Sequence, residues 1–528
     1  MKELKLEELS TRQKLGMTMT AFLSKKPEQL EYVLELIKNH SLGAVWVQPP
    51  RDDLEEVIAK IKAAADYPIL IVCDAESGIG DYMIGKHNAL GCTDREDLAY
   101  VFGKAIAVEA RNMGFNMLCN PILDMVYANS ACGGNVRSIG NDKYRVTALA
   151  RAEAQGMHDG GVLTVAKHYP GNSEEDYEID SHMAEGVSAA TVEELLDYNL
   201  YPYIELAKED LLDGMMTRHT RFTKIDDNYP ASLSQKIINI IRERGFNGFA
   251  MTDALCMMGV VAKFGKKGAI GLSIANGNDL SLPFFVDNAF SYNSLCECYD
   301  EGMISDERLD EAVSRVLAAQ SKTLIEPKYT HLTDEDEAMF RRINRDSVYA
   351  KVEEGMSIPV SRDGKHYFAV LTESTLSIED IGKVDVDTFG NDWYHPLEII
   401  DKLKALFPNS TVESITQFPS SGENCRVLDH SLDHEDIIFI TFYDSKAYLG
   451  TECFTSRILS LMKAMQVTNR ISTVVHFGNP YVLEDLPYIP RIIAGTVSAE
   501  SVLSAIDVLA GEYTANGKLT YDVKLKQK

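Results

Sequence analysis

The sequence contains no stretch that approaches 18 consecutive apolar residues, and its beginning, MKELKLEELSTRQKLGMTMT, lacks the apolar core of a secretion signal. The first absence argues against a membrane-spanning helix, and the second argues against export. No tract rich in proline, serine or glutamine interrupts the chain, so no long disordered segment is expected. We therefore expect a folded, cytoplasmic protein that has no membrane partner.

Positive charge is also scarce. The 528 residues include 52 lysines and arginines against 79 aspartates and glutamates, which gives a formal net charge of −27. Nucleic acids and anionic membranes would repel such a chain unless its basic residues clustered on one face, and the sequence shows no such cluster. We therefore expect no nucleic-acid partner.

The nine cysteines lack the regular spacing of a disulfide framework, and several lie within apolar runs such as 71–73 and 117–119. This pattern is typical of buried thiols in a reducing compartment. Cys296 and Cys298 are too close for a common zinc knuckle and have no second pair to complete four ligands. We expect neither a metal nor a cofactor.

What the chain does contain is a series of short apolar runs, each followed by a polar turn and a segment with helical spacing. Runs that are apolar on both faces and alternate with helices indicate a parallel sheet. Eight such units fit a closed (β/α)8 barrel of the TIM type, with an open doubly wound sheet as the alternative. The runs are 13–20, 42–47, 68–73, 116–119, 162–166, 214–217, 248–252 and 274–280.

Near residues 326–345 the series of apolar runs is interrupted by a charged stretch, and a second series of strands and helices is expected after it. Strands are expected at 366–372, 436–442 and 472–476, with a helix at 396–406. We predict a barrel over residues 1–330 and a smaller α/β sandwich over residues 331–528. No residue of the second domain suggests catalysis, and this domain could provide a buttress or the surface of a homodimer.

Polar residues follow most of the eight runs. In a parallel barrel the carboxyl ends of all strands surround one mouth, which is where the active site lies. We expect the following residues to meet there: Asp74, Glu76, Asp124, Lys167, His168, Arg218, His219, Asp253, Asn278 and Asp279.

Residue type and surroundings suggest what several of these side chains could do. Asp253 ends an apolar run, where a carboxylate can attack an electrophilic carbon, bind a metal or cap the next helix. His182 follows Asp180 at a spacing that lets the carboxylate accept from the imidazole, so His182 could exchange a proton near neutral pH. Lys167 can donate to hydroxyl groups, whereas Arg137 lies in a glycine-rich loop, where an arginine is usually exposed.

Taken in order, these segments resemble those of glycoside hydrolase family 3, in its β-N-acetylhexosaminidase branch. The resemblance runs along nearly the whole chain. In the first domain it covers Asp74-Ala-Glu-Ser-Gly78, Asn120-Pro-Ile-Leu-Asp124, Val136-Arg-Ser-Ile-Gly-Asn-Asp142, Lys167-His-Tyr-Pro-Gly171, Met216-Thr-Arg-His219 and Met251-Thr-Asp-Ala-Leu-Cys-Met257.

The resemblance implies a retaining, exo-acting β-N-acetylhexosaminidase that acts on a small carbohydrate substrate. Asp253 would be the nucleophile, and His182, oriented by Asp180, would be the acid/base. The residues that would hold the sugar are Asp74, Arg137, Lys167 and His168.

Four alternatives stay open. One is a β-glucosidase or another exo-glycosidase of the same family, and another is transfer of the sugar to phosphate instead of water. The third is a sugar-binding protein without catalytic activity, and the fourth is a metal hydrolase that uses Asp180, His182 and His219. Assays of turnover, of sugar binding and of sensitivity to a chelator separate them.

Overall fold

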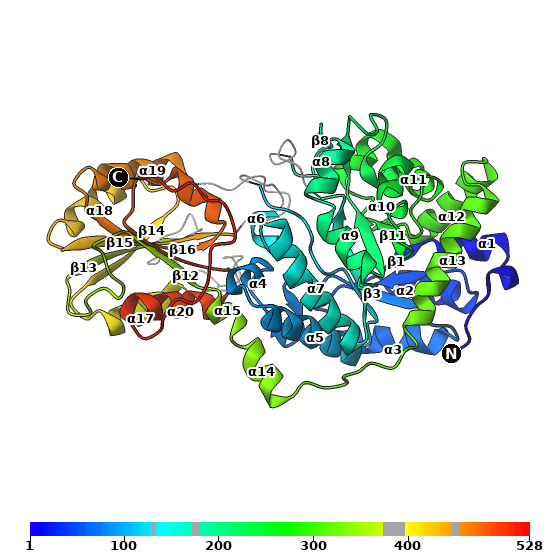
Figure 1. Ribbon diagram of the computed structural model, residues 1–528, viewed down its shortest axis with the longest axis horizontal. Coiled ribbons are helices and arrows are strands. Elements are labelled where there is room, and N and C mark those ends of the chain that lie inside the picture. The colour runs from blue at the N-terminus through cyan, green and yellow to red at the C-terminus, as the bar shows by residue number, and fades with distance from the viewer. Residues whose placement is uncertain (128–133, 172–178, 373–395, 445–453, 528) are drawn as a thin grey trace. The chain divides into compact units, whose positions relative to one another are not determined.

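The computed structural model describes residues 1–127, 134–171, 179–372, 396–444 and 454–527. Their contacts divide the chain into two compact units, each with its own sheet (Figure 1). The first unit comprises Met1–Met83, Arg95–Tyr127 and Asp142–Phe340, and the second comprises Ile84–Asp94, Ala128–Asn141 and Arg341–Lys528. Two short segments from the first third of the chain thus fold with the second unit, and the predicted boundary after residue 330 stays a prediction.

Seven short parallel strands form the main sheet of the first unit, and nearly all of their residues are buried. An eighth segment closes the ring, because Leu280 pairs with Met251 of the last strand and Ser281 pairs with Met19, next to the first. The predicted (β/α)8 barrel is confirmed. In sheet order the strands are β1 Thr20–Phe22, β2 Ala44–Trp46, β3 Leu70–Cys73, β6 Met117–Leu118, β7 Leu163–Tyr169, β9 Gly214–Thr217 and β11 Phe249–Thr252.

Helices connect successive strands of the barrel. They include α2 Pro27–Lys38, α3 Leu54–Ala64, α5 Glu96–Met113, α7 Lys143–Gly160, α9 Tyr201–Lys208, α10 Gln235–Arg242 and α11 Met258–Ala275. Local signals explain where several of them begin; for example, the Asp142 side chain accepts hydrogen bonds from the backbone N–H groups of Tyr144 and Arg145 at the start of α7. No helix within the described ranges is long and apolar enough to cross a membrane.

The first and last of the eight predicted runs need correction. Most of run 13–20 is helical, because Ser10 and Gln13 form a capping box that starts α1 (Thr11–Met17), and the strand begins only at Thr20. Run 274–280 begins inside α11, and only its last residue belongs to the barrel ring.

The helix α13, Asp306–Lys322, lies across the base of the barrel. Four of its side chains bind residues that immediately precede strands: Gln320 donates to the Gly43 carbonyl (3.0 Å), Lys322 to the Asp213 carboxylate (2.7 Å), and Arg308 (2.6 Å) and Arg315 (3.1 Å) to the Asp279 carboxylate. Val316 and Ala319 of this helix join the apolar core inside the barrel. The N-terminal ends of these strands are thereby covered.

This position of α13 shows that the mouth does not include Asn278 and Asp279, contrary to the prediction. Both residues precede the eighth strand segment instead of following it. Asp279 is fully buried, accepts from the backbone N–H of Ala250 (2.9 Å) and pairs with Arg242 (2.6 Å) as well as with Arg308. It therefore stabilises the base of the barrel.

The second unit is an α/β sandwich around a six-stranded sheet. All neighbouring strands are parallel except the edge pair β12 and β17, which is antiparallel. In sheet order the strands are β14 Thr411–Thr416, β13 His366–Thr372, β15 Asp436–Tyr443, β16 Ile471–Gly478, β17 Arg491–Gly495 and β12 Tyr349–Val352. The helices that cover this sheet include α17 Pro396–Leu406, α18 Ser421–Ser431, α19 Ser456–Gln466 and α20 Ala499–Ala510.

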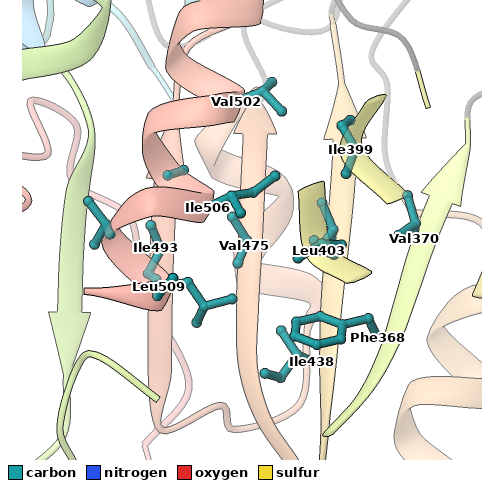
Figure 2. Packing of buried hydrophobic residues seen from close by; sticks show 14 of the residues in the cluster. Phe368, Val370, Ile399, Leu403, Ile438, Val475, Ile493, Val502, Ile506 and Leu509 are labelled. Carbon is teal, nitrogen blue, oxygen red and sulfur yellow. The ribbon is translucent and has the colours of Figure 1, made fainter. Parts of the chain in front are cut away.

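Successive side chains along the strands of the second unit point to opposite sides of the sheet, and both sides are apolar. Phe368 and Val370 of β13 pack with residues of α17 and α20, among them Leu403 and Ile506 (Figure 2). The intervening residues of β13, such as Ala369, face a second cluster that includes side chains of α18 and α19. Helices on both faces of a mostly parallel sheet confirm the predicted sandwich.

Candidate active site

Lys167, on β7, holds two carboxylates at the carboxyl end of β3. Its Nζ atom donates to Asp74 Oδ1 at 2.5 Å and lies 2.5 Å from Glu76 Oε1. The Lys167 side chain is only 2% exposed, whereas the Asp74 side chain is 38% exposed. The ammonium group thus offsets the repulsion between the two carboxylates, and Asp74 stays accessible from the mouth of the barrel.

The next residue, His168, links the end of β6 to the end of β11. Its Nδ1 donates to Asp124 Oδ2 at 2.6 Å, and its backbone N–H donates to Asp124 Oδ1 at 3.2 Å. The other ring nitrogen, Nε2, lies 4.0 Å from Asp253 Oδ2. Asp124 therefore fixes the orientation of the imidazole and turns Nε2 toward Asp253.

Asp253 follows β11 directly and is held by backbone contacts on both sides. Its N–H donates to the Thr217 carbonyl (2.9 Å), and its Oδ1 accepts from the N–H of Ala254 (2.7 Å). The side chain of Asp253 is 14% exposed, so its carboxylate is largely buried but still reaches the surface of the mouth.

The charge of Asp253 is maintained by its neighbours. Burial alone would raise the pKa of Asp253, but the imidazoles of His168 and His219 hold that pKa below its usual value. Burial lowers the pKa of His219 itself, whose ring nitrogens contact Ser232 Oγ (2.7 Å) and the Ala254 carbonyl (2.9 Å). Asp253 is therefore ionised at neutral pH.

His182 and Asp180 form a second histidine–carboxylate pair. Asp180 Oδ1 accepts from His182 Nδ1 at 2.7 Å and from the His182 backbone N–H at 2.8 Å. The side chain of Asp180 is 4% exposed and that of His182 is 17% exposed. Because the carboxylate holds the proton on Nδ1, proton exchange falls to Nε2.

A backbone contact places this pair near Asp253. The backbone N–H of Met258, one short turn after Asp253, donates to the His182 carbonyl (3.2 Å). The Asp180–His182 pair thus lies at the same end of the barrel as Asp74, Lys167, His168 and Asp253.

Arg137 is the exception among the residues that the family resemblance assigns to the site. It is the last residue of α6 (Gly134–Arg137), which folds with the second unit. Its predicted contact with a sugar stays a prediction.

Sequence reasoning gave Glu76 and Asp124 no role of their own, although both follow strands of the barrel. Their position at carboxyl ends of strands was the available signal, since the same criterion selected Asp74 and Lys167. A cavity of about 680 Å³ adjoins Asp74 and Glu76, and its wall also includes Gln48, Leu54, Ser77 and Met83. Carboxylates only accept hydrogen bonds, so this end of the mouth favours a ligand that carries hydroxyl groups.

The arrangement differs from a metal centre. Among the described residues, no group of three or more histidine, cysteine, aspartate or glutamate side chains has the geometry to hold a metal ion. His219, which a metal hydrolase would need as a ligand, contacts protein oxygen atoms through both ring nitrogens.

A closed (β/α)8 barrel whose mouth carries an ionised carboxylate and two carboxylate-paired histidines has the architecture of a TIM-barrel enzyme. Residues 3–319 match the glycosyl hydrolase family 3 N-terminal domain. Because this match covers more than half of the chain, the protein belongs to glycosyl hydrolase family 3.

Similar proteins carry more than one activity in their names. A beta-N-acetylglucosaminidase/beta-glucosidase from Cellulomonas fimi is 27% identical over 335 residues, which are 60% of this chain and 58% of that protein. This chain thus spans less than two thirds of that relative. A family 3 beta-N-acetylglucosaminidase from Paenibacillus sp. has a similar structure, with a TM-score of 0.78, 22% identity, and coverage of 98% of this chain and 100% of that chain. A beta-glucoside phosphorylase gives a TM-score of 0.80 at 24% identity, with coverage of 98% and 94%.

Proposed function

We propose that the protein is a retaining, exo-acting β-N-acetylhexosaminidase that removes terminal β-linked N-acetylglucosamine. The observation that carries this proposal is that an ionised Asp253 and a histidine oriented by its own carboxylate, His182, lie at the same barrel mouth. These are the two groups that a double displacement needs: a nucleophile that is charged and an acid/base that can hold or release a proton.

In the first step His182 gives its Nε2 proton to the glycosidic oxygen, and a carboxylate oxygen of Asp253 bonds to the anomeric carbon. The aglycone leaves as an alcohol, and a covalent glycosyl-enzyme remains. In the second step the neutral His182 takes a proton from water, the water oxygen bonds to the anomeric carbon, and Asp253 is released.

Asp180 would keep the His182 ring in one orientation through both steps, since its carboxylate binds Nδ1 whether or not Nε2 carries a proton. We propose that Asp74 and His168 contact the sugar hydroxyls while Lys167 holds the carboxylates in place. The N-acetyl preference rests on the names of the Cellulomonas and Paenibacillus proteins. A β-glucosidase with the same machinery is the alternative.

Phosphorolysis is a second candidate, and the type of the acid/base favours it. After protonating the leaving group, a histidine is neutral, whereas a carboxylic acid would become an anion and repel an incoming phosphate. A similar structure is named as a beta-glucoside phosphorylase.

One experiment tests these assignments together. Hydrolysis of 4-nitrophenyl β-N-acetylglucosaminide and of the corresponding β-glucoside is measured for the wild type, Asp253→Asn and His182→Ala, with and without phosphate. His331→Ala, at an exposed position, is the control. We expect preference for the N-acetyl sugar, loss of activity in Asp253→Asn and a decrease of about 10²- to 10⁴-fold in His182→Ala, the usual range for acid–base catalysis.

The outcomes separate the candidates. Preference for the glucoside would favour the β-glucosidase, and acceleration by phosphate with formation of a sugar phosphate would identify a phosphorylase. Full activity of His182→Ala on both sugars would disprove the acid/base assignment.

A further inference from the structure

The segment that carries His182 is attached to the helix that follows Asp253. The N–H groups of Met258 and Gly259, the first two residues of α11, donate to the carbonyls of His182 (3.2 Å) and Ser181 (3.1 Å). The first N–H groups of a helix have no partner within the helix, and the residue before α11, Met257, supplies no side-chain cap. The backbone of the His182 segment therefore serves as the cap of α11.

Gly259 makes this close approach possible. A Cβ atom at this position would lie 2.7 Å from the Ser181 carbonyl oxygen and 2.8 Å from the Ala184 carbonyl oxygen. Both are backbone atoms, so no side-chain rotation could relieve the contact. Ordinary contact begins at 3.4 Å, so the segment would have to move away by more than half an ångström.

The His182 segment has its own internal order, which would make it move as a piece. The N–H groups of Met183 (2.9 Å) and Ala184 (3.0 Å) both donate to the Asp180 carbonyl. Asp180 and His182 are thus part of one tight turn, and its displacement would carry the imidazole with it. Only four residues separate Asp253 from Met258, so the nucleophile and the start of α11, which holds this turn, belong to one short backbone segment.

We propose that Gly259 is a positioning residue: its missing side chain lets the first turn of α11 hold the Asp180–His182 turn at the distance from Asp253 that proton transfer to the leaving group requires. This inference rests on the proposed roles of His182 and Asp253. It goes beyond them by assigning the spacing between the two groups to one glycine.

The substitution Gly259→Ala tests the proposal, because helix propensity alone favours alanine over glycine and the expected damage comes only from the contact with the His182 turn. The matched control is Gly268→Ala, which lies beyond the kink at Gly265 of α11, since a Cβ atom there would meet nothing within 4 Å. His182→Ala serves as the reference for complete loss of the acid/base.

Two glycosides distinguish positioning from general damage. A phenyl β-N-acetylglucosaminide has a poor leaving group that needs protonation, whereas the 3,4-dinitrophenyl glycoside leaves without it. For Gly259→Ala we expect kcat/KM on the phenyl glycoside to fall by about 10- to 100-fold, the order of loss that a misplacement near 1 Å produces. We expect kcat/KM on the dinitrophenyl glycoside to stay within about twofold of the wild type, and Gly268→Ala to match the wild type on both.

A second readout does not depend on catalysis. Hydrogen exchange followed by mass spectrometry should show faster exchange in a peptide covering residues 179–185 for Gly259→Ala but not for Gly268→Ala. Equal loss on both glycosides, no loss on either, or unchanged exchange in this peptide would overturn the proposal. If the wild type lacked turnover, or if His182→Ala showed no dependence on the leaving group, the proposed function would fail instead, while the exchange measurement would still decide whether Gly259 holds the turn.

Discussion

Replacement of Asp213 by asparagine should show how much one buried charge at the base of the barrel contributes to stability. Asp213 immediately precedes β9, is almost fully buried, and pairs with His158 (2.8 Å) and Lys322 (2.7 Å). Burial alone would raise the pKa of Asp213, but His158 and Lys322 lower it to about 2 from its usual value of 3.8. At 1.36 kcal/mol for each pKa unit, the charge contributes about 2 kcal/mol to folding at neutral pH.

The direction of the pH dependence of stability follows from the linkage between proton binding and folding. Because the pKa of Asp213 is lower in the folded state, its contribution is complete above the unfolded value and is lost as the pH falls from about 4 toward 2. Asp213→Asn should therefore reduce the free energy of unfolding by about 2 kcal/mol at pH 7 and by roughly half as much at pH 3.

The assay is urea unfolding followed by far-ultraviolet circular dichroism at both pH values. Asp310→Asn is the matched control: Asp310 lies on α13 and pairs with Lys14 (2.6 Å), but its side chain is 43% exposed, so its removal should change stability by less than about 1 kcal/mol. If Asp213→Asn had an effect as small as the control, or one that did not depend on pH, the electrostatic explanation would be refuted.

Two further predictions concern the mouth of the barrel. In His168→Gln the acid limb of the kcat/KM profile should move to higher pH, because an imidazole that helps to hold the pKa of Asp253 low is removed. An unmoved limb in an active variant would contradict this explanation. In Lys167→Met the carboxylates of Asp74 and Glu76 would lose their shared cation, which should lower the free energy of unfolding by about 3 kcal/mol and raise KM. Unchanged values in urea unfolding and steady-state kinetics would contradict a stabilising role of the Lys167 ion pairs.

The fold could be predicted largely because both sheets consist of strands that are buried on both faces. β13 and α17 were predicted with the observed bounds, since an apolar run and a proline at the start of a helix are local signals. The folding of Ile84–Asp94 and Ala128–Asn141 with the second unit could not be predicted, because it depends on contacts between residues far apart in the sequence.

The site was predictable to the extent that the carboxyl ends of strands could be located. Asp74, Lys167 and Asp253 follow clear apolar runs, so the rule placed them correctly at the mouth. The rule failed for Asp279, because the apolar end of α11 resembles the start of a strand. The eighth strand was therefore expected to end near Asp279, whereas it begins after that residue. Its arginine partners, Arg242, Arg308 and Arg315, come close to it only when α10 and α13 pack in the folded protein.

The position of α13 across the base has a kinetic consequence for an enzyme that works at the mouth. In the part of the first unit that the structure describes, side chains fill the interior of the barrel and α13 covers its lower end, which leaves a bound sugar no passage through the barrel. In the proposed exo-glycosidase, a released monosaccharide would have to leave by the route through which the next substrate enters. Each cleavage would therefore end with dissociation of the shortened glycan, so we expect distributive degradation and competitive inhibition by the released monosaccharide.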